Sequence, residues 1–175
     1  MHLNVTRLFL FLLPVVLLGL SSCGREEPAV APVIVPIPGE VKMNEIYSRG
    51  TPGNLDWIEL YNTGETTLDI SGYLIYDAGG QGGTKPKKAI PAGTVIAPKS
   101  YFVVTTDTNS SAAVLDGFGL SSGGEQAWLE NATGAVIDAV TFPAMDVTQT
   151  YGRYPDGDTT WALLNTITKG TANKQ

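Results

Sequence analysis

Alternating hydrophobic and polar residues are the clearest pattern in the middle of this chain. Within 56–62, one face of an extended backbone carries two aliphatic side chains, and the opposite face carries Trp57, Glu59 and Tyr61. Period-two alternation is typical of a strand with one buried face. The run ends at Asn62-Thr63-Gly64, because Asn and Gly tolerate the positive φ of tight turns. The stretch therefore predicts a strand that is buried on one side.

The same pattern recurs along the rest of the chain and predicts an all-β fold. Further strands are expected at 41–47, 68–70, 73–76, 89–91, 94–97, 101–106, 125–131, 135–142, 151–154 and 161–164. We expect a glycine-rich loop over 78–88, one helical turn at 112–115 and a frayed polar tail over 169–175. Residues 41–175 suffice for an antiparallel β-sandwich of about seven to nine strands.

The amino-terminal residues have the pattern of an export signal. The apolar run 8–20 is too short to span a bilayer comfortably, so residues 1–22 are expected to be a signal peptide. Leu20-Ser21-Ser22-Cys23 resembles a bacterial lipobox, which implies that the Cys23 thiol carries acyl chains, palmitate among them. The alternative is an ordinary signal peptide with a chance cysteine.

The segment 23–40 is predicted to be a tether between the lipid and the folded domain. Its four prolines favour an extended polyproline conformation with a reach on the order of 50 Å. Alternatively, part of 33–37 lies along the sandwich as an edge strand. Gly24 after the cysteine favours the outer membrane of a Gram-negative cell, and Glu26-Glu27 resembles an acidic surface-export signal. We therefore expect a lipid-anchored protein of the cell envelope, with a surface-exposed position as one option.

Six segments, in this order, carry a family resemblance. They are NEI at 44–46, DWIELYN at 56–62, LDISGYLIYD at 68–77, IPAGTVIAPKSYFVV at 90–104, GLSSGGEQAWLENATGAVIDAV at 119–140 and YGRYPDGDTTW at 151–161. Together they resemble a bacterial lamin tail domain over nearly all of 41–175. The resemblance implies an immunoglobulin-like β-sandwich with a role in interaction or scaffolding and without shared catalytic residues.

Composition excludes several classes of catalyst. Cys23 is the only cysteine and His2 the only histidine, and His2 is expected to leave with the signal peptide. The remaining chain then lacks the residues for Ser-His-Asp or Cys-His catalysis and for zinc sites built on His or Cys. We expect no cofactor and no enzymatic activity.

The charge balance argues against nucleic acid as a partner. Loss of Arg7 with the signal peptide leaves 10 of the 11 basic residues against 17 acidic ones, a formal net charge of −7. Nucleic-acid binding generally needs a basic face. Lys85, Lys87 and Lys88 form the only basic cluster, which is expected to be solvated, with phosphate contact as the alternative.

Trp57, Glu59 and Tyr61 are the candidate ligand-binding residues. An exposed aromatic pair beside a carboxylate can stack on a sugar ring and bind its hydroxyls. Tyr73 could extend this platform, and Glu45 lies beside it if the first strand pairs with the second. The favoured interpretation is nevertheless structural: Trp57 covers the sandwich edge and Glu59 bonds to a neighbouring loop.

Other acidic residues suggest metal or hydrolytic chemistry only weakly. Asp77, Asp156 and Asp158 are loop oxygen donors of the kind that Ca²⁺ prefers, but turn formation is the favoured explanation for them. Asp56 and Glu59 are three apart in a strand, so they point to opposite faces and do not share a substrate. A metal-assisted hydrolase that uses carboxylates alone is therefore the weakest hypothesis for the function.

Arg153 and two tryptophans are expected to be structural. Arg153 precedes the acidic turn at 155–158, so we expect it to pair with a loop carboxylate. The family's G-R-x-P-D-G pattern, which 152–157 matches, implies a structural role for it. Trp128 and Trp161 are expected to pack in the core or at its edge.

The sequence as a whole predicts a non-catalytic binding or scaffolding module of the cell envelope. It is held at the membrane by its lipid and binds an unidentified protein or glycan. The loops 78–88 and 107–113 are candidate contact regions. A carbohydrate-binding module is the alternative.

Overall fold

The computed structural model describes residues 41–51, 53–106 and 117–175. The chain divides into two units, Met1–Pro32 and Val33–Gln175, and every described residue lies in the second. Within the described part of the chain, no helix is long and apolar enough to cross a membrane.

Several sequence-based predictions lie outside these residues. They concern the signal peptide, the lipid on Cys23, the tether over 23–40, the loop 107–113 and the helical turn at 112–115. They remain predictions.

Eleven strands and one short helix form the described chain. They are β1 (Val41–Tyr47), β2 (Trp57–Asn62), β3 (Leu68–Asp69), β4 (Leu74–Asp77), α1 (Ala78–Gly82), β5 (Lys88–Ala89), β6 (Val95–Ile96), β7 (Tyr101–Thr105), β8 (Gly124–Glu130), β9 (Val136–Pro143), β10 (Thr150–Arg153) and β11 (Trp161–Leu164). The predicted all-β class is confirmed. The strand count exceeds the expected about seven to nine because β3, β5 and β6 are two-residue pieces.

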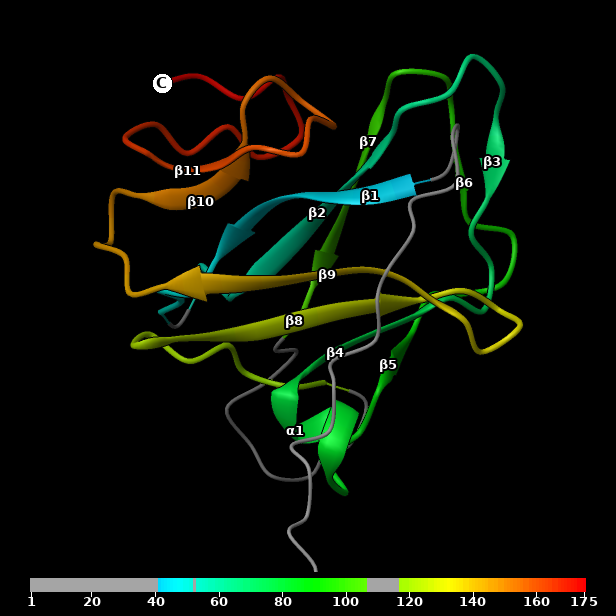
Figure 1. The fold of residues 1–175 in the computed structure, drawn as a ribbon, viewed down its shortest axis with the longest axis horizontal. Helices are drawn as coiled ribbons and strands as arrows, with labels where there is room; N and C mark the ends of the chain where they lie inside the picture. The colour runs from blue at the N-terminus through cyan, green and yellow to red at the C-terminus, as the bar shows by residue number, and fades with distance from the viewer. Residues whose placement is uncertain (1–40, 52, 107–116) are drawn as a thin grey trace, which may run out of the picture. The chain divides into compact units, whose positions relative to one another are not determined.

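The strands form two main antiparallel sheets that pack as an immunoglobulin-like sandwich. One sheet has the order β11-β10-β1-β2-β7 and the other β5-β4-β8-β9, while β3 and β6 form a small third sheet. Figure 1 shows β8 and β9 lying against the sheet that contains β1 and β2. The predicted hairpin across 132–134 joins β8 to β9. Strands β7 and β5 each end their sheet, so each has one edge that pairs with no strand among the described residues.

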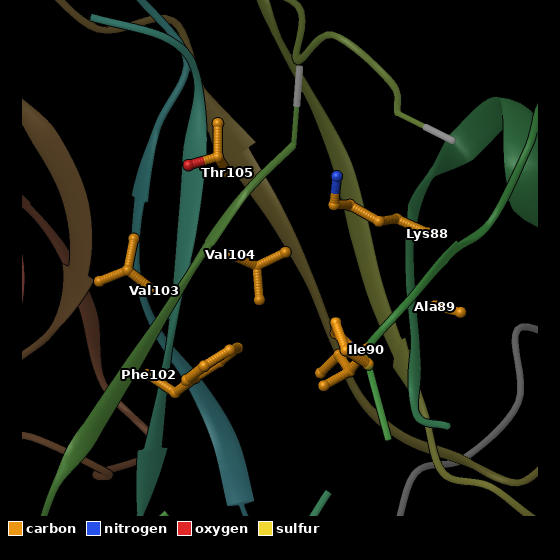
Figure 2. Close-up of a pocket in the computed structure, with 8 residues that line it drawn as sticks. Lys88, Ala89, Ile90, Phe102, Val103, Val104 and Thr105 are labelled. Atoms are coloured by element: carbon orange, nitrogen blue, oxygen red, sulfur yellow. The ribbon is translucent and has the colours of Figure 1, made fainter. Parts of the chain in front are cut away.

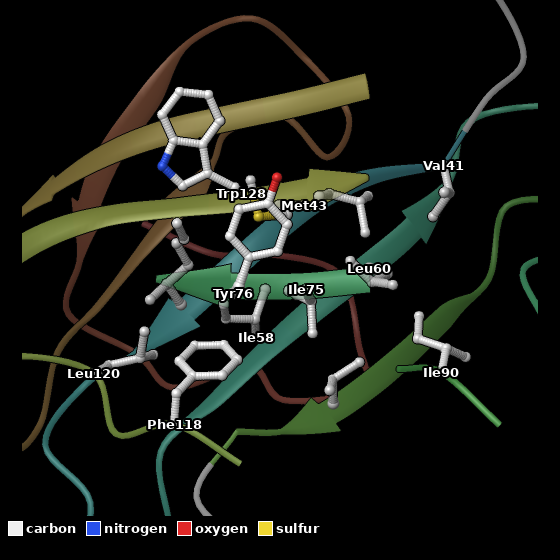
Figure 3. Packing of buried hydrophobic residues seen from close by; sticks show 14 of the residues in the cluster. Val41, Met43, Ile58, Leu60, Ile75, Tyr76, Ile90, Phe118, Leu120 and Trp128 are labelled. Atoms are coloured by element: carbon white, nitrogen blue, oxygen red, sulfur yellow. The ribbon is translucent and has the colours of Figure 1, made fainter. Parts of the chain in front are cut away.

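The core lies between the inner faces of these sheets, where the alternation predicted from the sequence is realised. Its fully buried members include Met43, Ile46, Ile58, Leu60, Ile75 and Leu129. In Figure 3, Ile58 and Leu60 of β2 lie close to Ile75 of β4. Burying one such side chain contributes roughly 1.5–3 kcal/mol. The inner positions of β1, β2, β4 and β8 therefore supply much of the driving force for folding.

A short helix replaces the first part of the loop that was predicted over 78–88. Asp77 is its N-cap, and its Oδ1 accepts from Gly80 N–H at 2.9 Å. An N-cap carboxylate satisfies backbone donors that have no partner inside a helix. Periodicity could not reveal this helix because it spans only five residues, three of them glycine.

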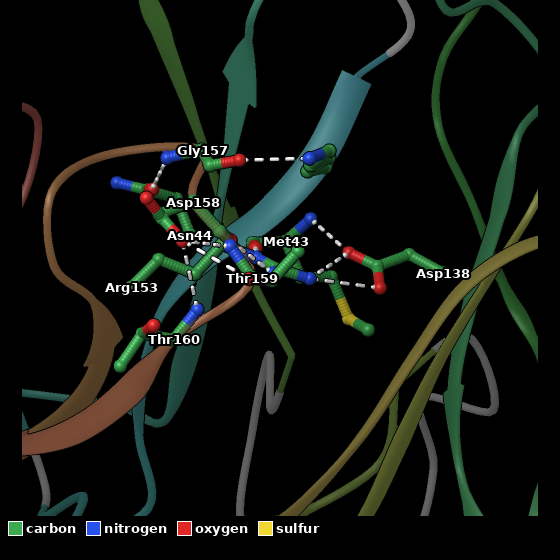
Figure 4. A network of polar contacts seen from close by, with 9 residues as sticks. Met43, Asn44, Asp138, Arg153, Gly157, Asp158, Thr159 and Thr160 are labelled. Atoms are coloured by element: carbon green, nitrogen blue, oxygen red, sulfur yellow. Dashed lines mark hydrogen bonds and ion pairs between the residues drawn. The ribbon is translucent and has the colours of Figure 1, made fainter. Parts of the chain in front are cut away.

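A buried ion pair joins the two sheets (Figure 4). Arg153 Nη2 of β10 lies 3.0 Å from both carboxylate oxygens of Asp138 in β9. Arg153 Nε donates to the Met43 carbonyl at 2.7 Å, and Asp138 Oδ2 accepts from Met43 N–H at 2.9 Å. Arg153 Nη1 donates to the Asp158 carbonyl, and its guanidinium lies 4.6 Å from the ring centroid of Trp161.

This geometry corrects one prediction and agrees with another. The carboxylate partner of Arg153 is a strand residue, not a loop residue, because β9 of the second sheet lies next to β1. Sequence alone could not predict that neighbour. The loop does contribute to the network, but through the backbone carbonyl of Asp158. The role of Arg153 in the described structure is structural.

Replacing Arg153 by Ala should therefore destabilise the fold strongly. The substitution leaves the buried Asp138 carboxylate without its counter-charge, which typically costs about 3–5 kcal/mol. Urea unfolding followed by circular dichroism measures the change. Arg49→Ala is the control, because Arg49 is half-buried and has no ion pair with a described residue; it should change stability by no more than about 0.5 kcal/mol. Equal effects of the two substitutions would contradict the assigned role.

Candidate functional site

Trp57, Glu59 and Tyr61 share the face of β2 that points away from the core, as the alternation predicted. Trp57 is only 1% exposed and Glu59 is fully buried. The Trp57 ring stacks on the Tyr47 ring, with their centroids 5.9 Å apart. The ring centroids of Tyr61 and Tyr101 are 4.9 Å apart. These residues therefore form no exposed aromatic platform, because another part of the chain covers the face. The favoured interpretation, in which Trp57 is covered and Glu59 bonds to a neighbouring loop, agrees with the structure.

The covering segment is the carboxyl-terminal stretch 165–175. Its backbone N–H groups donate to three carboxylates, at 3.0 Å from Thr168 to Glu45, 2.6 Å from Gly170 to Glu59 and 3.0 Å from Asn173 to Asp156. Thr168 and Asn173 are buried. The predicted frayed tail over 169–175 is thus corrected: this polar sequence is ordered because the carboxylates supply acceptors for its backbone.

These three acids, Glu45, Glu59 and Asp156, form what we term the carboxylate cluster. Glu45 and Glu59 are direct register partners on β1 and β2, as expected if those strands pair. Asn44 Nδ2 donates to Glu59 at 3.0 Å and to Asp156 at 3.1 Å. Tyr101 O–H donates to Asp156 at 2.5 Å. The cluster is thus held by neutral donors rather than by a counter-charge.

Burial controls the protonation of the cluster. Desolvation raises the pKa of Glu59 to about 7, against the opposing hydrogen bonds from Asn44 and Gly170. Desolvation also raises the pKa of Glu45, which accepts from Thr150 Oγ1 at 2.6 Å. Across the described residues, no group of three or more His, Cys, Asp or Glu is arranged to hold a metal ion. The geometry therefore serves to fasten the carboxyl-terminal segment.

The other acids singled out from the sequence also have structural partners. Asp77 caps α1 and pairs with Lys85 at 2.7 Å. Asp158 Oδ1 accepts from the backbone N–H of Thr160 at 3.2 Å, within its own turn. Asp56 accepts from the backbone N–H of Leu120 at 2.9 Å. Asp77 and Asp158 thus follow the turn interpretation, and Asp56 and Glu59 bond to different parts of the chain.

An apolar groove of about 180 Å³ lies between the open edges of the two sheets. Residues 88–91 line one wall and residues 102–105 the other. Figure 2 shows Phe102 and Val104 of β7 pointing toward Ile90, with Val103 pointing away. Lys88 is the charged residue among those that line the groove. Sequence reasoning missed this groove, because nothing local marks β5 and β7 as the outermost strands of their sheets.

Hydrogen bonds show which backbone groups face the open edge of β7. Asn62 N–H donates to the Ser100 carbonyl and Thr106 N–H to the Asp56 carbonyl, both at 3.0 Å. Since bonding alternates along an antiparallel strand, even-numbered residues of β7 face β2. The amides of Tyr101, Val103 and Thr105 therefore point to the open edge.

The three lysines of the basic cluster have different surroundings. Lys85 pairs with Asp77, and Lys87 pairs with Glu130 at 2.7 Å while lying 4.1 Å from the Tyr76 ring centroid. Lys88 makes no ion pair with a described residue. Lys88 is the one of the three that also lines the groove.

The raised pKa of Glu59 predicts a stability that falls as pH rises. The folded protein holds the Glu59 proton more tightly than the unfolded chain, where the pKa is near 4.5. The resulting stabilisation is full below that value and is lost as pH rises through about 7. Glu59→Gln should reduce the fall in unfolding free energy between pH 5 and pH 8 by up to about 1.4 kcal/mol per pH unit.

Chemical denaturation at a series of pH values measures this slope. The matched control is Glu65→Gln, because the Glu65 side chain is 84% exposed. The control should keep the slope of the unchanged protein. Identical slopes for Glu59→Gln and the unchanged protein would show that Glu59 does not titrate differently in the folded state.

Comparison with known proteins agrees with this architecture. The profile of the Lamin Tail Domain family matches residues 36–144, which include β1 through β9. The search of curated proteins finds no match to this chain. Because the family match covers more than half of the sequence, the chain belongs to the lamin tail domain family.

Proposed function

We propose that this protein is a non-catalytic binding module held at the bacterial cell envelope by a lipid on Cys23. Lamin tail domains are immunoglobulin-like domains that commonly mediate interaction. The lipobox-like sequence at 20–23 supports the anchor. An acyl chain contributes about 0.8 kcal/mol per buried methylene, so several chains hold a protein firmly at a membrane.

The groove between β5 and β7 is the observation that carries the binding role. It combines an apolar floor with an edge of β7 that pairs with no described strand. Such an edge is a template for an added strand, whose main-chain hydrogen bonds provide affinity. We therefore infer that the ligand is an extended peptide segment of a partner protein, which adds to β7.

Side chains in the groove set the specificity. Alternate residues of an added strand would point inward between Ile90, Phe102 and Val104, so these positions favour apolar side chains. Lys88, which lines the groove, favours an acidic residue near one end of the peptide. This favours a protein ligand over a glycan, because the aromatic platform expected for a sugar is buried at Trp57.

Val103→Pro should weaken peptide addition to β7 while preserving the fold. Proline removes the N–H of Val103, which points to the open edge, and leaves the bonds between β2 and β7 intact. We would screen a display library of 12-residue peptides for members that bind the full chain, which is kept in detergent. Enriched peptides should alternate apolar and polar residues and bind Val103→Pro at least about tenfold more weakly, a loss of about 1.4 kcal/mol.

Val103→Thr is the matched control, because it keeps the backbone donor and a β-branched side chain. It should bind the selected peptides like the unchanged protein. Peptides that bind all three proteins equally would place the binding surface elsewhere and contradict the proposal for the groove.

Cys23→Ala should release the protein from the membrane. The substitution removes the thiol that receives the acyl chains, and the described residues contain no helix able to span a bilayer. Fractionation of cells that express each form, with detection by immunoblot, measures the change. Ser22→Ala keeps a small residue before the cysteine and should stay in the membrane fraction. Retention of Cys23→Ala there would refute the lipid anchor.

A further inference from the structure

Strand β11 ends the first sheet on the side opposite β7. Among the described residues it hydrogen-bonds to β10 and to no other strand. Tyr154 N–H donates to the Thr160 carbonyl at 3.1 Å, and the same antiparallel register continues into β10 and β11. Since hydrogen-bonded positions alternate along such a pair, the even-numbered residues of β11 bond to β10. The N–H and C=O groups of Trp161 and Leu163 therefore point to the other edge of β11.

An apolar row of side chains runs from the core to this edge. Trp161 is the register partner of Arg153, which reaches into the sandwich, so Trp161 and Leu163 lie on the inner face of the sheet. The rings of Tyr151 and Trp161 stack with their centroids 5.3 Å apart, and both side chains pack against the core. Leu163 is the register partner of Tyr151, yet its side chain is 43% exposed. The row thus ends in an apolar side chain that is largely open to solvent.

The second sheet covers β11 only in part, which explains this exposure. Its end strand β9 lies next to β1, and Arg153 of β10 reaches across to contact Asp138 there. Strand β11 lies beyond β10 at the end of the first sheet (Figure 1). The inner face of β11 therefore extends past the last strand of the second sheet.

The edge of β11 lacks the residues that commonly keep an edge strand from pairing, which are charged residues and proline. In the second sheet, β5 contains Lys88, and β9 contains Asp138 and Pro143. Strand β11, Trp-Ala-Leu-Leu, contains no such residue. Strand β7 also lacks them, but it borders the groove that we assign to a peptide. Because the chain has a formal net charge of −6, two copies repel each other least at an uncharged surface such as the edge of β11.

Two copies of β11 are complementary to each other. If they pair antiparallel about Ala162, Trp161 of each copy lies opposite Leu163 of the other. Both residues point their N–H and C=O groups to this edge, so each pair can exchange backbone hydrogen bonds. The same register places the exposed Leu163 side chain against the indole of the other copy, and cross-strand pairs of aromatic and aliphatic side chains stabilise a sheet.

We propose that this protein forms a symmetric dimer in which β11 pairs antiparallel with β11 of a second copy, centred on Ala162. The two five-stranded sheets then join into one continuous sheet. Two short strands bury less than a standard interface of about 1,600 Å², so the dimer is weak and forms at high protein concentration. A lipid anchor of the kind proposed above concentrates the chains on a surface and favours the dimer, but the pairing itself does not depend on the anchor.

Disulfide cross-linking tests the register of this pairing. The full chain carries Cys23→Ala, which removes the natural thiol, together with Ala162→Cys, and is kept concentrated in detergent. Residue 162 lies on the two-fold axis at a non-hydrogen-bonded position, where facing Cα atoms are about 4.5 Å apart, within the range for a disulfide. Oxidation with copper phenanthroline and non-reducing electrophoresis measure the rate at which linked dimer forms.

Thr160→Cys in the same Cys23→Ala chain is the matched control. Thr160 is exposed and shares the strand face of Ala162, but the two copies of residue 160 lie roughly 14 Å apart in the proposed register. We expect Ala162→Cys to cross-link at least about tenfold faster than Thr160→Cys, because only the first pair is within reach. Equal rates for the two variants would overturn the proposal.

Leu163→Lys, added to the Ala162→Cys chain, tests the apolar contact at the edge. The exposed position of Leu163 lets the fold persist, which circular dichroism checks, and the added charge opposes pairing of the edge. Cross-linking should slow by at least about tenfold. An unchanged rate in the folded Leu163→Lys variant would contradict pairing through β11.

Discussion

The buried contact between Arg153 and Asp138 is the constraint on which the rest of the structure depends. It links β10 of one sheet to β9 of the other and bonds to the backbone of β1 from both sides. A buried ion pair adds little net stability, because desolvation offsets most of the attraction. Its value lies in geometry: any other alignment of the two sheets would leave a charge unpaired in the core.

This alignment determines what happens on the outer face of β1 and β2. With β10 in place, the turn at 155–157 brings Asp156 next to Asn44 and Tyr101. The carboxylate cluster can then bind the backbone of 168–173. An acid-rich chain thus uses its acids as acceptors for its own carboxyl-terminal segment. Strands β7 and β5 lie at the ends of their sheets among the described residues.

Much of the fold follows from local sequence. Alternation in 56–62 located β2, and turn residues at 132–134 located the β8–β9 hairpin, because side-chain period and turn chemistry act over a few residues. Glu45 was expected beside Glu59 if the first strand paired with the second, and the register of β1 with β2 agrees with that. Helix α1 escaped this reasoning because a five-residue helix has too little period to detect.

The sequence by itself determined the fold class, the family and the sharing of one strand face by Trp57, Glu59 and Tyr61. Only the tertiary structure decided that this face is covered, that Arg153 pairs with Asp138, and that Ile90 and Phe102 line one groove. The reason is physical. Alternation along a strand indicates which residues share a face. Contacts between residues far apart in the chain decide which strands lie at the edge of a sheet.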